Sequence, residues 1–214
     1  IHIGDGTFYK TGNSAVWEIR GDLLEKNYYV DNVCPLMSRV IGIEFHSKFR
    51  SGGANGCWGV QTSKKIARNF LLDNGFTPGR KTHTVKVPEY IFASSIKNKR
   101  AFVRGLFDTD GCLRFDRING RPLHDYPKLE FGFASKDLRD TLQVLLKDLN
   151  FRNYVWLDKA TMAYKICIAG KTQLERWIKE IEPRNPKHLN KYQIWKELGF
   201  YQKAEMAQSG TAQI

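Results

Sequence analysis

The chain carries one short acidic motif twice. Gly4-Asp5-Gly6 returns 105 residues later as Thr109-Asp110-Gly111, and a strand-like run follows each copy. Repetition at this distance indicates two copies of one supersecondary unit, which bury their apolar faces by packing on each other. A chain of 214 residues is long enough for two such units. The duplication therefore restricts the fold to two similarly built halves.

The elements that follow each motif come in the same order. Apolar residues at intervals of three and four predict helices at residues 23–40, 64–72, 136–149 and 171–178. Alternation of apolar and polar residues predicts strands at 18–20, 45–49, 58–62, 129–133, 154–158 and 164–168. We therefore predict an α+β fold of two pseudo-twofold-related halves. Each half has the order αββαββα and a four-stranded antiparallel sheet with helices on one face.

The predicted halves differ in size and are joined by a connector. The N-terminal half is expected to span residues 1–76, with its first helix truncated. Residues 77–98, which contain Pro78-Gly79, Pro88 and several basic residues, are expected to form the linker. Residues 99–214 are expected to form the C-terminal half.

The charge balance favours an anionic partner. The chain has 34 lysines and arginines against 22 acidic residues, a net charge of +12, which suits DNA, RNA or an acidic membrane. No apolar run approaches the ~18 residues of a membrane span. Its four scattered cysteines form no C-x-x-C pair, so a structural zinc site is not expected. We expect an intracellular protein, cytoplasmic or organellar and not secreted, with an upstream stretch preceding Ile1.

Each predicted strand has an apolar and a polar side. Phe49 and Leu157, for example, are assigned to the apolar side, which packs on helices, while the polar side stays open. An open face of bases, acids, amides and aromatics can lie in the DNA major groove and bind base edges. An ordinary solvated sheet surface is the alternative. The residues that we expect to contact DNA are Tyr9, Glu18, His46, Lys48, Arg50, Gln61, Arg114, Asp116, Arg117, Lys128, Glu130, Trp156 and Lys165.

The second acidic motif has a long and specific sequence. The nine residues 103–111, Val-Arg-Gly-Leu-Phe-Asp-Thr-Asp-Gly, strongly resemble the signature of the LAGLIDADG homing endonucleases. Residues 1–6 look like the last six positions of a first copy, without its three leading positions and with Ile3 in place of an acid. Two copies about 100 residues apart, each followed by the same elements, resemble the single-chain members of this family.

The resemblance implies a metal-dependent active site. It implies two motif helices side by side below a DNA-binding saddle, with small residues such as Gly4, Gly105 and Thr109 at the contact. Asp5 and Asp110 would then meet at the helix ends, each before a glycine that can adopt positive φ. The carboxylates of Asp5 and Asp110 and the carbonyl groups of Gly4 and Thr109 would hold Mg²⁺, about two or three ions.

Three further residues have expected roles near this site. Lys136 and Arg20 lie where the second strand of each half meets the next helix, so we expect both to assist catalysis. Asp108 is expected to be structural, because it leaves the helix on a different side from Asp110 and could pair with a nearby Lys or Arg.

The resemblance also implies the reaction and the target. We expect a monomer that makes one double-strand break in a non-palindromic DNA site of roughly 20 base pairs, as in intron homing. Two unlike halves would read two unlike half-sites. The alternatives on the same scaffold are an RNA maturase and a DNA-binding regulator that has lost the chemistry. Retention of both acids favours cleavage, because two apposed carboxylates would only repel phosphate in a pure binder.

Overall fold

The fold consists of two four-stranded antiparallel sheets with the same strand order. The computed structural model describes residues 1–51, 56–118, 120 and 122–201. The first sheet has the order β1-β2-β4-β3, formed by Gly6–Thr11, Ser14–Gly21, Cys57–Thr62 and Lys48–Arg50. The second has the order β5-β6-β8-β7, formed by Gly111–Asp116, Tyr126–Phe133, Ala163–Ala169 and Tyr154–Asp158. The predicted α+β fold with two such sheets is confirmed.

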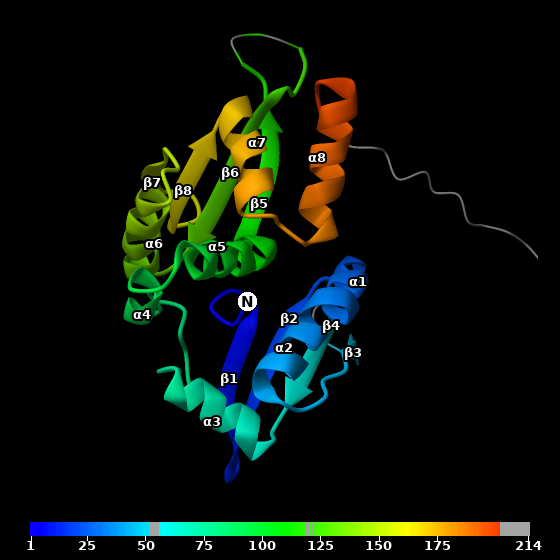
Figure 1. Ribbon diagram of the computed structural model, residues 1–214, viewed down its shortest axis with the longest axis vertical. Coiled ribbons are helices and arrows are strands. Elements are labelled where there is room, and N and C mark those ends of the chain that lie inside the picture. Colours follow the sequence, from blue (N-terminus) through cyan, green and yellow to red (C-terminus); the bar gives the residue numbers. More distant parts are fainter. Residues whose placement is uncertain (52–55, 119, 121, 202–214) are drawn as a thin grey trace, which may run out of the picture.

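In the second half, α6 (Lys136–Asp148) and α7 (Lys171–Glu180) begin and end close to the predicted positions, and the motif helix is α5 (Ile96–Asp110). An unpredicted helix, α8 (Pro186–Leu198), begins at the side-chain cap Asn185 and packs on β5. In Figure 1, α5 and the N-terminus lie between the two sheets. None of the helices within the described residues is long and apolar enough to cross a membrane.

The long helix predicted at residues 23–40 is interrupted. It consists of a 3₁₀ turn (Leu23–Glu25), α1 (Lys26–Tyr28), a π-helical turn (Tyr29–Val33) and α2 (Cys34–Ile41). The π turn precedes Pro35, which has no N–H to donate and whose ring crowds the preceding turn, so the wider turn accommodates it. The remaining helices are α3 (Lys65–Asp73) and a short α4 (Glu89–Phe92) in the connector.

The strand at residues 45–49 was predicted too early in the chain. Strand β3 begins only at Lys48, although Phe45 is buried. Phe49 pairs with Trp58 on the helix-covered face, as the alternation predicts, but it is 55% exposed because β3 lies at the sheet edge. Leu157 on edge strand β7 is 39% exposed for the same reason. Alternation therefore predicted the face correctly and the burial wrongly.

The connector packs against both halves. The Gly79 N–H donates to the carbonyl of Phe8, and Ser135 Oγ donates to the carbonyl of Val85 at 2.6 Å. The Val87 N–H donates to Thr141 Oγ1 at 3.0 Å. These contacts fix the connector against β1 in the first half and α6 in the second.

The larger hydrophobic core lies in the second half and centres on Trp177. The fully buried ring of Trp177 lies 5.1 Å from the ring of Phe107, 6.0 Å from that of Phe131 and 5.1 Å from that of Phe151, all centroid to centroid. Helix α6 contributes leucines at positions 138, 142, 145 and 146, the spacing of one helical face. Trp177 thus joins α7, the motif helix α5 and strand β6.

We predict that Trp177→Ala lowers the free energy of unfolding by about 3–5 kcal/mol, since it leaves a large cavity among three aromatic rings. Denaturant unfolding measures this change. Val144→Ala on the 56% exposed position of α6 is the control, expected to change stability by less than about 0.5 kcal/mol. Equal effects of the two substitutions would contradict the described core.

Candidate active site

Helix α5 delivers Asp110 to the junction between the two sheets. The helix begins at the cap Ser95, whose side chain accepts from the Asn98 N–H, and it ends at Asp110. Gly111 then turns directly into β5 with a φ of −81°, so the positive φ expected after the acid is wrong. The glycine is needed for space instead: a Cβ there would lie 2.5 Å from the carbonyl oxygen of Phe107.

The first motif packs against the last turn of α5. A Cβ on Gly4 would lie 2.1 Å from Thr109 Oγ1 and 3.1 Å from Asp110 Oδ2. A Cβ on Gly105 would lie 3.0 Å from the backbone nitrogen of Ile1. Residues 2–5 form turns and not a helix. Small residues therefore allow the close approach that brings Asp5 and Asp110 to one place.

The two carboxyl groups are poorly solvated and repel each other. Burial, then the neighbouring charges of Asp110 and Glu25, raise the pKa of Asp5 to about 7. Burial also raises the pKa of Asp110, while Lys81 and Lys187 act in the opposite direction. Tyr29 Oη donates to Asp5 Oδ2 at 3.3 Å. A cation bound between these groups would favour ionisation of both.

Two lysines that the sequence did not identify lie in the site. Lys81 Nζ donates to the carbonyl oxygen of Gly4 at 2.9 Å and also to that of Ile3. Lys187 Nζ donates to the carbonyl oxygen of Thr109 at 3.0 Å. Each lysine follows the closing helix of its half, α3 or α7, and each contacts the carbonyl of the residue before a motif aspartate. The signal available in the sequence was that each lysine follows the closing helix of its half.

Contacts between the halves position Lys187. Its ammonium group pairs with Glu25 at 2.9 Å, a buried acid of the first half. Asn185 Nδ2 donates to Glu25 Oε1 at 2.6 Å and to the carbonyl oxygen of Asp108 at 2.8 Å. Glu25 also caps the backbone of Asp22. Glu25 therefore connects the first half to the second active-site lysine.

Asp108 has a structural environment, as expected, but different partners from those considered. Its carboxylate accepts from the backbone N–H groups of Arg184 and Asn185 at 3.0–3.2 Å. Tyr28 Oη donates to it at 3.5 Å. The residue thus fixes the segment before α8 and, through it, Lys187.

The two residues predicted to assist catalysis have other partners. The guanidinium of Arg20 pairs with Glu18 at 2.8 Å, although the Arg20 N–H donates to the carbonyl of Asp5 at 3.3 Å. Lys136 pairs with Asp140 at 2.6 Å in the first turn of α6, and its side chain is 60% exposed. Neither side chain has a described contact with Asp5 or Asp110, whereas Lys81 and Lys187 lie in their immediate surroundings.

Most residues predicted to contact DNA occupy the open sheet faces. Strand register places them on the side of each sheet opposite the buried core, as the alternation predicts; they are Tyr9, Glu18, Lys48, Arg50, Gln61, Arg114, Asp116, Lys128, Glu130, Trp156 and Lys165. His46 precedes β3 and Arg117 follows β5, so both lie outside the strands. Glu18 is only 3% exposed and lies beneath arginines, so it cannot bind a cytosine edge directly.

Two hollows in the surface at the site both have Lys81 in their lining. One hollow of about 420 Å³ is lined by Asp5, Gly4 and Lys81, among others, and a second of about 210 Å³ is lined by Asp110, Gly4 and Lys81. Each acid therefore has its own accessible space.

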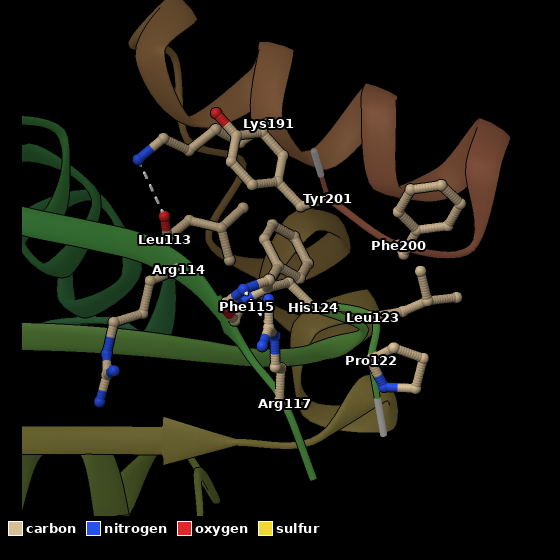
Figure 2. A pocket seen from close by; sticks show the side chains of 10 residues that line it. All are labelled: Leu113, Arg114, Phe115, Arg117, Pro122, Leu123, His124, Lys191, Phe200 and Tyr201. Carbon is tan, nitrogen blue, oxygen red and sulfur yellow. Dashed lines mark hydrogen bonds between the residues drawn. The ribbon is translucent and has the colours of Figure 1, made fainter. Parts of the chain in front are cut away.

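A separate pocket of about 550 Å³ lies between β5 and α8 (Figure 2). Its lining includes Phe115, Tyr201 and Lys191, whose Nζ donates to the carbonyl of Leu113. It contains neither motif aspartate, so it is distinct from the candidate active site.

Comparison with known proteins agrees with this architecture. A family model described as a LAGLIDADG-like domain matches residues 97–182. The homing endonuclease I-DmoI, in mesophilic variants, is similar with a TM-score of 0.59 and 17% identity, covering 88% of this chain and 91% of that chain. I-DmoI in complex with DNA and Mn gives a TM-score of 0.56 and 18% identity, covering 85% and 92%.

Two further proteins extend the comparison. The meganuclease I-SmaMI bound to uncleavable DNA has a TM-score of 0.60 and 12% identity, covering 92% of this chain and 87% of that chain. Among curated proteins, the replicative DNA helicase DnaB of Rhodothermus marinus is 26% identical over 117 residues. That match takes in 53% of this chain but only 12% of the helicase, so the chain spans a small part of that relative's length. The structural likeness confirms the predicted fold.

We predict that Asp5→Asn stabilises the metal-free protein, and more so at pH 8 than at pH 5. Because the pKa of Asp5 is about 7 in the folded state against 3.8 ordinarily, the folded protein binds more protons between these values. The free energy of unfolding of the wild type therefore falls as the pH rises through this window. Melting temperatures in EDTA should show a gain that is larger at pH 8 by roughly 5 °C.

Asp31→Asn at an exposed position is the control for this measurement. Its effect on the melting temperature should be small at both pH values. A gain from Asp5→Asn that shrinks as the pH rises would show that Asp5 is not held in a poorly solvated, repulsive site.

Proposed function

We propose that this chain is a site-specific DNA endonuclease, because a LAGLIDADG-like family model matches residues 97–182 and the described residues have the two-sheet fold of the homing endonuclease I-DmoI and the meganuclease I-SmaMI. It hydrolyses one phosphodiester bond in each strand of a long asymmetric target, with a divalent metal ion as cofactor. The observation that carries this proposal is the pair of half-buried motif aspartates, whose pKa values are raised, where the first motif packs against the end of α5.

The donor set fits a hard divalent cation such as Mg²⁺. Asp5 and Asp110 supply carboxylates, and Gly4 and Thr109 supply carbonyl oxygens on the two sides. The described residues include no group of three or more His, Cys, Asp or Glu that could hold a metal ion, so DNA phosphate and water would complete the coordination. When bound, the cation supplies Lewis-acid activation of water and of the scissile phosphate. Mn and Ca in the I-DmoI complexes with DNA support this choice.

Lys81 and Lys187 supply positive charge beside the reacting phosphates. An ammonium group preorganised next to the phosphate stabilises the negative charge that develops as water attacks. Lys81 accompanies Gly4 and Asp5, and Lys187 accompanies Thr109 and Asp110. We therefore assign one lysine to each DNA strand, in place of the Arg20 and Lys136 expected from the sequence.

The two open faces account for an asymmetric target. The N-terminal face carries Tyr9, Lys48 and Gln61, while the C-terminal face carries Arg114, Lys128 and Trp156. Unlike side chains read unlike half-sites, so a monomer joined by the linker at residues 77–98 binds a non-palindromic duplex. The net charge of +12 makes this binding strongly dependent on salt.

We predict that Asp5→Asn and Asp110→Asn each abolish double-strand cleavage in Mg²⁺ while leaving DNA affinity within a few-fold of the wild type. The target is first selected from a randomised duplex library, and cleavage and gel shifts are then measured on it. If both variants cut at normal rates, the assignment of metal ligands is wrong. Tight binding of a folded RNA with no selected duplex would instead favour the maturase.

We predict that Lys81→Met and Lys187→Met slow opposite strands. Loss of one positioned donor should reduce cleavage of the strand assigned to that lysine by about 100-fold. With each strand labelled separately, a nicked duplex in which only the other strand is cut should accumulate. Lys136→Met is the matched control, since this exposed lysine pairs with Asp140 on α6. Equal slowing of both strands by either variant would refute the assignment of one lysine to each strand.

A further inference from the structure

Two poorly exposed glutamates occupy the same position on the two open sheet faces. Glu18 lies on β2 immediately before Ile19, which pairs with Gly6 of β1. Glu130 lies on β6 immediately before Phe131, which pairs with Gly111 of β5. Their side chains are only 4% and 14% exposed. Acids are unexpected at the centre of a surface that is to bind a polyanion, because they repel phosphate.

Each glutamate holds two cationic side chains. Glu18 pairs with Arg20 at 2.8 Å and with Arg50 at 3.4 Å. Glu130 pairs with Arg114 at 3.1 Å and Lys165 at 3.2 Å. The two partners of each glutamate come from different strands, so the glutamate is the shared anchor of its group.

One cation of each group lies on a central strand, but the two sheets use non-equivalent central strands for it. Arg20 on β2 pairs in register with Gly59 on β4, whereas Lys165 on β8 pairs with Gly132 on β6. These two register pairs are equivalent, with the cation and the glycine exchanged. A Cβ on Gly59 would lie 2.4 Å from the carbonyl oxygen of Ile19 and 3.3 Å from Arg20 Cγ, and one on Gly132 would lie 3.0 Å from Lys165 Nζ.

This exchange indicates what the arrangement maintains. Both sheets have a cation beside the glutamate and a glycine paired with that cation, although different strands provide them. A merely solvated surface has no need to keep both features. The retained feature is a cation in a fixed orientation on the open face.

We propose that Glu18 and Glu130 position the cationic side chains that determine base specificity. This inference rests on the proposed endonuclease function. Each holds its cations in the geometry that hydrogen-bonds base edges in one half-site. Arginine and lysine read guanine through O6 and N7 only when their donors are correctly aimed. A partner fixed beforehand reduces the loss of side-chain freedom on binding.

The test measures base discrimination, not cleavage. A target is selected with the wild-type chain in EDTA, and affinities for all single-base variants of it are measured. Glu18→Gln should lose about fivefold or more of its discrimination at the positions that Arg50→Ala also affects. Glu130→Gln should do the same in the other half-site, at the positions that Lys165→Ala affects. Asp31→Asn removes the same charge at an exposed helical position and should leave the profile unchanged.

The possible outcomes separate the two proposals. A wild-type chain that selects no sequence contradicts the endonuclease proposal and this inference with it. A selected target whose discrimination survives both glutamine variants, with affinity raised equally for all sequences, leaves the endonuclease intact and overturns the positioning role. Loss of discrimination across both half-sites from either single variant also overturns it. Unchanged melting temperatures of the glutamine variants exclude unfolding as the cause.

Discussion

The contact between Gly4 and the last turn of α5 determines the geometry of the candidate active site. A side chain at position 4 would overlap Thr109, so glycine alone allows the first motif to approach this closely. The same approach places two carboxyl groups in one poorly solvated site and raises the pKa of Asp5 to about 7. The close approach of the two motifs and the raised pKa of Asp5 therefore both depend on this contact.

Each motif aspartate depends on residues from beyond its own motif, and the second depends on the other half of the chain. Thr109, beside Asp110, is contacted by Lys187, which Glu25 of the first half holds in place. Asn185 joins Glu25 to the motif helix through the carbonyl of Asp108. Removing one partner from such a buried network leaves the others unsatisfied, which costs more than an exposed ion pair would. A chain whose halves separated would therefore lose the geometry of the second site as well as the interface.

The sequence predicted what periodicity and repetition can report. Alternation gave the sheet faces, and the helical spacing of the leucines gave α6, because both patterns follow from backbone geometry. Lys81 and Lys187 escaped prediction, since they lie in or just after irregular segments whose path depends on tertiary packing. The deep burial of Glu18 and the exposure of Phe49 escaped for a related reason: alternation assigns a face but not what covers it. Helix α8 was missed because its apolar residues form no clear single face, and its start is set by the Asn185 cap.

The charge of the open faces acts at two ranges. The excess of 12 positive charges attracts a polyanion from a distance, and this attraction weakens as salt screens it. Close pairs such as Arg50 with Glu18 and Arg114 with Asp116 add nothing to that excess, since each contains both signs. They act only at contact distance, where the direction of a side-chain donor decides which DNA base can accept its hydrogen bond. Net charge and ion pairing therefore contribute to different properties of one surface. The acidic residues on it are compatible with a DNA-binding role because they fix the orientation of the arginine and lysine side chains around them.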